Sequence, residues 1–275
     1  MRSTFGNVKL NQVCRSTVFI LTATFVSEYL FKVIPINKLP LSHFWQIILE
    51  RSLSSGLALT FMWFFYPQAL NRLSFKFSNV RFLYSIGLIS FLFLPSLLRA
   101  HIQNFTFSQI ISGFVFALFI GIDEEIFSRG LIFAALEQYG IWVSAIVSSI
   151  HFGILHLGNA IWGGQSLSYT LAQVLGASAT GFFFVGLMLF TGSIWVPIFL
   201  HGLIDTPMQF ETLPVYTSQV TGTPNWGASL VQAIVYCAIG WALIKASNPG
   251  PDQKFVKWVK KYFLETESAT PTTDQ

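Results

Sequence analysis

The sequence Gly121-Ile-Asp-Glu-Glu-Ile-Phe-Ser-Arg129 places three carboxylates and one arginine inside an apolar segment that extends from about Ile110 to Leu136. A charged side chain at the centre of a membrane-spanning helix costs about 2.5–3.5 kcal/mol on insertion scales. Ionisable groups at such positions are therefore normally paired, and they are candidates for function. We expect the partners of this cluster in other apolar segments downstream, at His156, His201 and Asp205.

The composition indicates a polytopic membrane protein. Of the 275 residues, 53% are hydrophobic and only 10% are charged, whereas a typical soluble domain has about 25% charged residues. The formal net charge is +4, and the basic residues gather at the two ends and in one early connection. This placement favours contact with the lipid bilayer, and we expect no nucleic acid partner. The two cysteines, Cys14 and Cys237, imply neither a disulfide framework nor a cysteine metal site.

Several segments have the length and apolar character of membrane-spanning helices, which need about 20 predominantly apolar residues. The eight candidates are approximately residues 15–36, 44–66, 80–100, 108–137, 141–158, 168–191, 194–209 and 227–246. Ionisable residues at positions 28, 50 and 51 interrupt the first two. The expected fold class is all-α: a polytopic membrane protein in which about eight transmembrane helices form a bundle around an intramembrane polar cavity.

The basic residues between these segments predict the orientation. With the N-terminus inside, most Lys and Arg residues fall on the inner side, and the outer connections hold Lys32, Lys38 and Arg99. The positive-inside rule then places both termini in the cytoplasm of a multi-pass protein of the cell membrane, which we expect to be bacterial. We predict one membrane-embedded helical domain over residues 1–247, followed at 248–275 by a cytoplasmic basic amphipathic segment and a flexible tail.

Residue spacing suggests which polar side chains act together. Glu125 and Arg129 are four residues apart on a helix, so they share a face and can pair. Glu124 is rotated by about 100° from Glu125 and has no local partner, which makes it the freer carboxylate. His201 and Asp205 repeat the four-residue spacing. A purely structural ion pair that locks helices together is the alternative interpretation of the cluster.

Three short motifs resemble those of one family. Glu124-Glu-Ile-Phe-Ser-Arg129 resembles EExxxR, Phe152-Gly-Ile-Leu-His156 resembles FxxxH, and His201-Gly-Leu-Ile-Asp205 resembles HxxxN/D. Their order is that of the CAAX-protease and bacteriocin-processing (CPBP) family of intramembrane endopeptidases. Each motif alone is a weak signal, but three in order inside a polytopic chain are a strong one. The resemblance covers about residues 106–210, which would be the catalytic core.

The resemblance implies hydrolysis of a peptide bond in a membrane-associated peptide or protein. Glu124 and His156 would activate water, and His201 with Asp205 would stabilise the oxyanion. Glu125, Arg129 and Phe152 would support these catalytic residues. The chemistry agrees for Glu124, because a carboxylate in an apolar site suits a general base. An ionised Asp205 cannot donate to an oxyanion, so it must be protonated or must orient His201 from behind, and we favour the orienting role.

The same residues leave two further questions open. Glu124, His156 and His201 would also satisfy a zinc site with an open position for water, although we favour a mechanism without a cofactor. A catalytically silent membrane immunity or peptide-binding protein on the same scaffold is the alternative function. A secondary transporter that uses the carboxylates for proton coupling is less favoured, since the two halves of the chain show no visible repeat.

Overall fold

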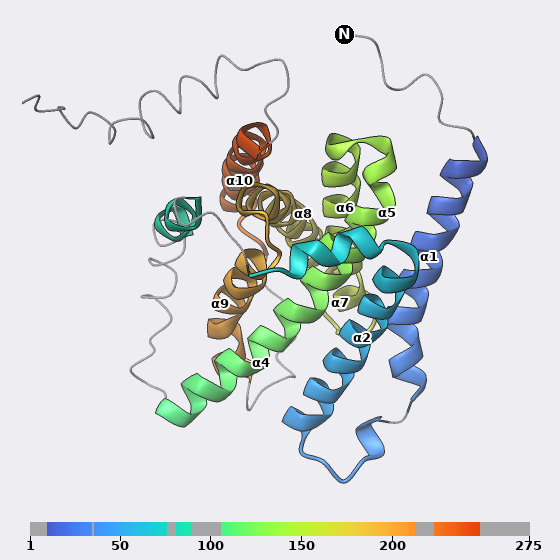
Figure 1. The fold of residues 1–275 in the computed structure, drawn as a ribbon. Helices are drawn as coiled ribbons and strands as arrows, with labels where there is room; N and C mark the ends of the chain where they lie inside the picture. Colours follow the sequence, from blue (N-terminus) through green and yellow to red (C-terminus); the bar gives the residue numbers. More distant parts are fainter. Residues whose placement is uncertain (1–9, 35, 76–80, 90–105, 213–222, 248–275) are drawn as a thin grey trace, which may run out of the picture.

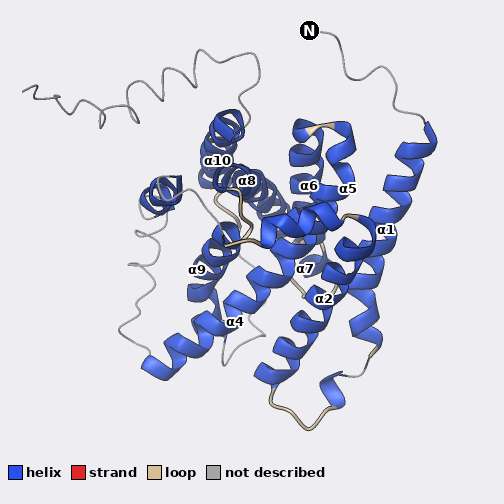
Figure 2. Cartoon of the chain, in the orientation of Figure 1, coloured by secondary structure: helices blue, strands red, loops and turns tan. Residues whose placement is uncertain are grey.

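The computed structural model describes residues 10–34, 36–75, 81–89, 106–212 and 223–247. Across these residues all regular structure is helical and no strand occurs, which confirms the all-α prediction (Figure 2). The N-terminal part contains α1 (Leu10–Val33), the short 3₁₀ helix η1 (Ile36–Lys38), α2 (His43–Phe65) and η2 (Pro67–Leu73). A further helix covers residues 81–89, the described part of the third predicted segment.

The segment that carries the acidic cluster is not one uniform helix. It consists of α4 (Phe107–Glu125), the π-helix η4 (Ile126–Ile132), α5 (Phe133–Leu136) and the 3₁₀ helix η5 (Glu137–Tyr139). A capping box at Thr106 starts α4, where the Thr106 hydroxyl accepts from Gln109 N at 3.3 Å. The prediction of one continuous α-helix over 108–137 is corrected here, because the wider π-helical turn begins directly after Glu125. Such turns are frequent at functional sites.

The C-terminal half forms the rest of the bundle. It contains α6 (Ile141–Leu155), α7 (Gly158–Ile161), α8 (Leu167–Thr191), α9 (Trp195–Thr212) and α10 (Trp226–Ser247). Gly140 has a φ of 97°, which suits glycine, and it turns the chain from η5 into α6. The short helix α7 falls within the predicted connection 158–168.

Glycines bring the helices of this half close together. In Figure 1, α8 lies beside α6 and α10, its most extensive partners, and α4 packs along α9. A Cβ atom on Gly121 would lie 2.9 Å from the carbonyl oxygen of Ile198 in α9. A Cβ atom on Gly186 would lie 2.8 Å from the carbonyl oxygen of Gly240 in α10. These two glycines therefore allow the helices to approach closely, whereas a Cβ atom on Gly176 would meet nothing within 4 Å.

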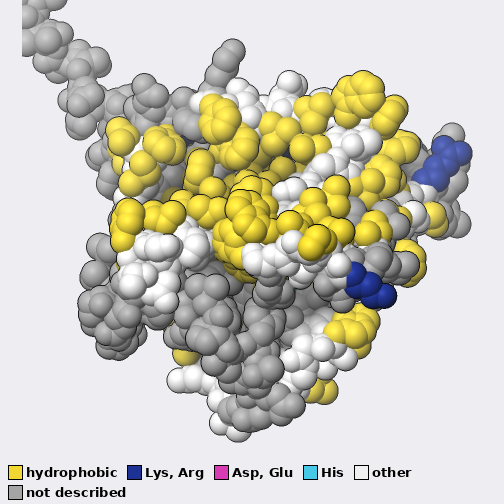
Figure 3. Space-filling model, turned by 90° about the horizontal axis from the view of Figure 1, so that it is seen from below, with side chains coloured by type: hydrophobic (Ala, Val, Ile, Leu, Met, Phe, Trp, Pro, Cys, Tyr) yellow, Lys and Arg dark blue, Asp and Glu magenta, His cyan; other side chains and the backbone are white. Residues whose placement is uncertain are grey.

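The surface and the apolar helices are those of a membrane protein. Within the described residues, three stretches are long and apolar enough to cross a membrane, namely Ile141–Ile161, Leu167–Thr191 and Trp226–Ser247. Seen from below, hydrophobic side chains spread over much of the described surface, and Lys and Arg are visible only near one edge (Figure 3). The number of about eight spans stays a prediction, and the basic segment 248–275 lies outside the described residues.

Three connections meet at one end of the bundle. Arg72 in η2 forms an ion pair with Glu137 in η5. The N–H of Ile194, between α8 and α9, donates to the carbonyl oxygen of Arg72 at 2.9 Å. The predicted topology assigns all three connections to the same side of the membrane, so their contact agrees with the predicted alternation of spans. The side that faces the cytoplasm stays a prediction.

The crossing of α6 and α8 generates a stability prediction. A Cβ atom on Gly153 would lie 2.6 Å from the carbonyl oxygen of Val174 and would also overlap Ser178 Oγ. Gly153→Ala should therefore lower the free energy of unfolding by about 1–3 kcal/mol, the usual cost of overpacking. Thermal unfolding of the detergent-solubilised protein measures the change. Gly56→Ala is the control, because a Cβ atom there would meet nothing within 4 Å. Equal stability of the two variants would contradict this account of the crossing.

Candidate active site

A buried ion pair lies at the start of the π-helix. Arg129 Nη1 donates to Glu125 Oε1 at 3.0 Å, and their side chains are 1% and 0% exposed. The predicted pairing of these residues is confirmed. Burial removes both charges from water, so each depends on the other for compensation.

The guanidinium of Arg129 is enclosed by aromatic rings from two neighbouring helices. Its Cζ atom lies 4.3 Å from the ring centroid of Phe152 in α6 and 5.5 Å from that of Phe184 in α8. A Cβ atom on Gly181 would come within 2.9 Å of Arg129 Nη2, so glycine at this position leaves room for the arginine. Cation–π contact suits a guanidinium shielded from water. Arg129 therefore ties η4 to α6 and α8.

His201 of α9 is attached to the same carboxylate. Its Nδ1 lies 2.8 Å from Glu125 Oε1, the oxygen that also accepts from Arg129. Its Nε2 lies 3.4 Å from Asp205 Oδ2 and 3.7 Å from Glu124 Oε2. A carboxylate at Nδ1 fixes the ring orientation, and carboxylates beside both ring nitrogens favour the doubly protonated imidazolium, in which Nδ1 and Nε2 both donate. The contact from behind that we expected of Asp205 is thus made by Glu125, and Asp205 lies on the Nε2 side.

His156 is oriented by its own helix. Its Nδ1 lies 3.1 Å from the carbonyl oxygen of Phe152, one turn earlier, and the two rings meet edge-on at 5.1 Å. A carbonyl oxygen can only accept, so Nδ1 carries the hydrogen and Nε2 of the neutral ring is left as an acceptor. Phe152 therefore supports both polar groups, since its backbone positions His156 and its ring covers Arg129.

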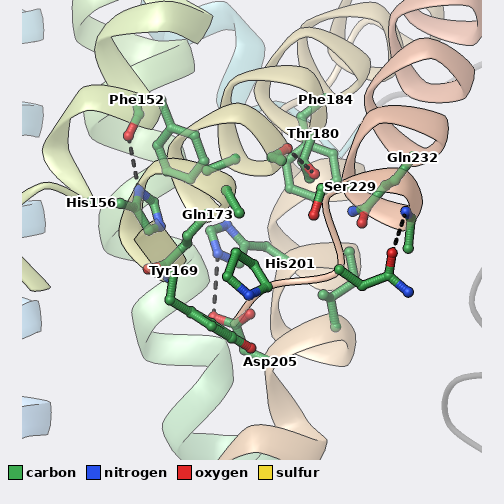
Figure 4. Close-up of a pocket in the computed structure, with 17 residues that line it drawn as sticks. Phe152, His156, Tyr169, Gln173, Thr180, Phe184, His201, Asp205, Ser229 and Gln232 are labelled. Atoms are coloured by element: carbon green, nitrogen blue, oxygen red, sulfur yellow. Dashed lines mark hydrogen bonds and ion pairs between the residues drawn. The ribbon is translucent and has the colours of Figure 1, made fainter. Parts of the chain in front are cut away.

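The two histidines and Asp205 line one cavity of about 450 Å³ between α6, α8, α9 and the start of α10 (Figure 4). Dashed lines in Figure 4 mark the contacts of His156 with Phe152 and of His201 with Asp205. The other walls carry small, aromatic and uncharged polar side chains. They are Phe152, Tyr169, Ala172, Gln173, Gly176, Ala177, Thr180, Phe184, Ile204, Pro224, Asn225, Ala228, Ser229 and Gln232.

Glu124 lies next to this cavity and is not part of its lining. One carboxylate oxygen is 3.7 Å from His201 Nε2, and the other is 3.7 Å from Arg51 Nη1 of α2. Arg51 Nη1 also donates to Asp123 Oδ2 at 3.0 Å. Glu124 therefore lies between an arginine and a histidine, and neither belongs to its own helix, which agrees with the expectation that it has no local partner. Its partners come from other helices, which spacing along one helix does not reveal.

The side chains do not form a metal site as they are arranged. Within the described part of the chain, no group of three His, Cys, Asp or Glu side chains could hold a metal ion. Glu124, His156 and His201, the ligands of the alternative zinc site, are instead engaged with Arg51, with the Phe152 carbonyl and with Glu125.

Sequence reasoning missed Arg51 and Asp123. Asp123 is 5% exposed and also accepts from Ser55 Oγ at 3.5 Å, so it is a buried acid held by α2. The sequence did contain a signal for Arg51, because an arginine inside an apolar segment is itself a candidate for function. We had interpreted Arg51 only as an interruption of the predicted span 44–66. His151, the other histidine of α6, instead contacts Thr24 of α1 at 2.8 Å.

The buried pair generates a prediction for stability. Glu125→Ala and Arg129→Ala should each cost about 3–5 kcal/mol, because each leaves an uncompensated buried charge. The double variant should lose much less than the sum of the two, and unfolding of the solubilised protein measures this coupling. The Arg72–Glu137 pair, whose side chains are 17% and 32% exposed, is the control and should couple weakly. Additive losses at Glu125 and Arg129 would show that the pair does not stabilise the fold.

The sequence comparisons agree with this geometry. Residues 105–207 match the family described as Rce1-like, type II CAAX prenyl endopeptidase Rce1-like. The chain is also 36% identical over 100 residues to a protein of Bacillus subtilis (strain 168) named "Putative membrane peptidase YdiL". That alignment spans 35% of this chain and 36% of the relative, and no solved structure is significantly similar. The segment 105–207, which holds the polar cluster and both histidines, is therefore similar to a family of membrane peptidases, and the chain spans about a third of the length of the curated relative that it matches.

Proposed function

We propose that the protein is an intramembrane endopeptidase that hydrolyses a peptide bond in a membrane-associated peptide or protein. The observation that carries the proposal is the meeting of His156, His201 and Asp205 at one cavity, with Glu124 only 3.7 Å from His201 Nε2. The similarity of residues 105–207 to a membrane peptidase family supports it. In this proposal the chain crosses the cell membrane several times and both termini are cytoplasmic.

The chemistry begins with a water molecule between Glu124 and His156. Glu124 takes one proton from the water as the water oxygen attacks the scissile carbonyl carbon. Nε2 of His156 accepts a hydrogen bond from the remaining O–H and so orients the water. The carbonyl oxygen becomes an oxyanion, to which His201 donates from Nε2. When the carbon–nitrogen bond breaks, the proton held by Glu124 passes to the leaving amine. Water is consumed, and a carboxyl and an amine are produced.

The surrounding charges hold these groups in place. Glu125 fixes the His201 ring through Nδ1, which turns Nε2 toward the cavity. Arg51, itself bonded to Asp123, holds Glu124 from the side opposite His201. Asp205 lies 3.4 Å from Nε2 of His201, where it directs the Nε2 hydrogen before a substrate enters.

Two substitutions test the water-activating pair. Glu124→Gln and His156→Ala should each lower turnover by at least about 100-fold, since general acid–base catalysis contributes about 10²–10⁴-fold. The purified wild-type protein is incubated with a library of membrane peptides, and cleavage is read by mass spectrometry. His151→Ala is the control, because this histidine of the same helix contacts Thr24 and does not line the cavity. Near wild-type turnover in either test variant would refute the assignment, and binding without cleavage by the wild type would favour a silent binding protein.

Asp205 is tested by two substitutions of different chemistry. Asp205→Asn keeps the shape and a hydrogen-bond acceptor, so it should retain substantial activity, whereas Asp205→Leu should lose most of it. Both variants and the wild type are assayed with and without a chelator, followed by added zinc. Activity that falls on chelation and returns with zinc would replace this mechanism with a metal-dependent one. Full activity of Asp205→Leu would remove Asp205 from the site.

A further inference from the structure

The carboxamide of Gln173 on α8 has a fixed orientation. Asn159 Nδ2 donates to Gln173 Oε1 at 2.9 Å, and Gln165 Nε2 donates to the same oxygen at 2.9 Å. Because both neighbours donate, the accepting atom is the oxygen, and the nitrogen occupies the other branch of the amide. Among the described residues Gln173 Nε2 has no hydrogen-bond partner, and Gln173 lines the cavity together with His156 and His201 (Figure 4).

Gln173 belongs to a polar surface formed by two helices. On α8, Tyr169 precedes Gln173 by four residues and therefore shares its face of the helix. On α10, Ser229 and Gln232 line the same cavity and are three residues apart. The side chains of Tyr169, Ser229 and Gln232, like the Gln173 amide nitrogen, have no hydrogen-bond partner within the described part of the chain. All four are uncharged. We call Tyr169, Gln173, Ser229 and Gln232 the amide-binding wall.

Unpartnered polar groups are costly where water is scarce. A backbone or side-chain amide without a partner in the hydrocarbon region costs several kcal/mol. A substrate helix that unwinds into an extended peptide for cleavage has the same energetic cost, because its main-chain N–H and C=O groups lose their hydrogen-bond partners within the helix. The two sets of groups are complementary: the wall offers donors and acceptors without charge, and an extended main chain requires both.

We propose that the amide-binding wall binds the main chain of an extended substrate peptide and that Gln173 Nε2 donates to one of its carbonyl oxygens. The inference rests on the proposed function, and it defines the ligand as a peptide main chain recognised beside the two histidines. Asn159 and Gln165 act through Gln173, because they hold its oxygen and so present its nitrogen to the cavity.

The test measures peptide binding separately from cleavage. The probe is the fluorescein-labelled library peptide that binds most tightly to the full-length Glu124→Gln protein in detergent, as measured by anisotropy. Adding Gln173→Met to this protein should raise Kd by about 3- to 10-fold, as expected for the loss of one neutral hydrogen bond. Gln46→Met is the matched control, because the Gln46 amide contacts the carbonyl oxygens of Leu39 and Leu41, outside the cavity. It should leave Kd unchanged.

Ester substitution identifies the hydrogen bond itself. Peptides in which one amide bond at a time is replaced by an ester carry a weaker carbonyl acceptor at that position. At one position, the ester should weaken binding to the protein that has Gln173. The same ester should not weaken binding further in the Gln173→Met protein, because the effects of removing both partners of a direct contact are not additive. If Gln173→Met lowers the thermal stability, Gln173→Glu replaces it, because it keeps the accepting oxygen and loses the donors.

The outcomes separate the two proposals. An unchanged Kd in the folded Gln173 variant, or ester effects that are the same with and without Gln173, would overturn the amide-binding wall. Absence of cleavage by the wild-type protein would instead overturn the proposed peptidase activity. The Kd measurement would still decide whether the wall binds a peptide main chain, because the Glu124→Gln protein does not depend on turnover.

Discussion

One carboxylate oxygen, Oε1 of Glu125, holds the centre of this structure together. It accepts from Arg129 at 3.0 Å and lies 2.8 Å from Nδ1 of His201, so it joins the π-helix to α9. If any of these buried charges lacked a partner, its desolvation penalty would exceed the electrostatic attraction that stabilises it. The fold meets this condition by enclosing Arg129 between Phe152 and Phe184, which brings α6 and α8 to the same point. Four helical segments are thereby fixed around one charged group.

Local features make that arrangement possible. The π-helical turn begins at Ile126, directly after Glu125, and all of its residues are buried. Gly181 leaves the space that Arg129 fills, and Gly121 lets α4 approach α9 closely enough for Glu125 to reach His201. In a membrane, where lipid tails are as apolar as the side chains, such close packing supplies much of the attraction between helices. The same small residues thus contribute to stability and to the geometry of the site.

The polar groups are arranged in two parts that serve different purposes. Behind the cavity, Glu125 and Arg129 orient His201 and are sealed from its contents. Beside the cavity, Glu124 lies between Arg51 and His201, and it is partly exposed. Arg129 and His201 face Glu125, and Arg51 and His201 face Glu124, so each of these two carboxylates has two cationic or hydrogen-donating neighbours. A site of this kind keeps Glu124 and Asp205 partly exposed while Glu125 and Arg129 are paired and buried.

Much of this protein could be predicted from the sequence because the signals are local. Apolar length determined that the chain is helical and membrane-embedded, and the four-residue spacing of Glu125 and Arg129 determined their pairing. The second and third motifs contain residues that line the cavity, and the first contains Glu124 beside it, although their catalytic roles stay predictions. The start of the π-helix at Ile126 was not predictable from apolar periodicity, since the same residues fit a regular helix.

Only the tertiary structure decided which helix supplies each partner. Arg51 reaches Asp123 across 72 positions of sequence, and His201 reaches Glu125 across 76. The orientation of Gln173 depends on Asn159 and Gln165, which precede its helix. Such contacts follow from how helices cross and how each is rotated about its axis. Packing of the whole bundle sets both quantities, whereas spacing along one helix specifies only which side chains share a face.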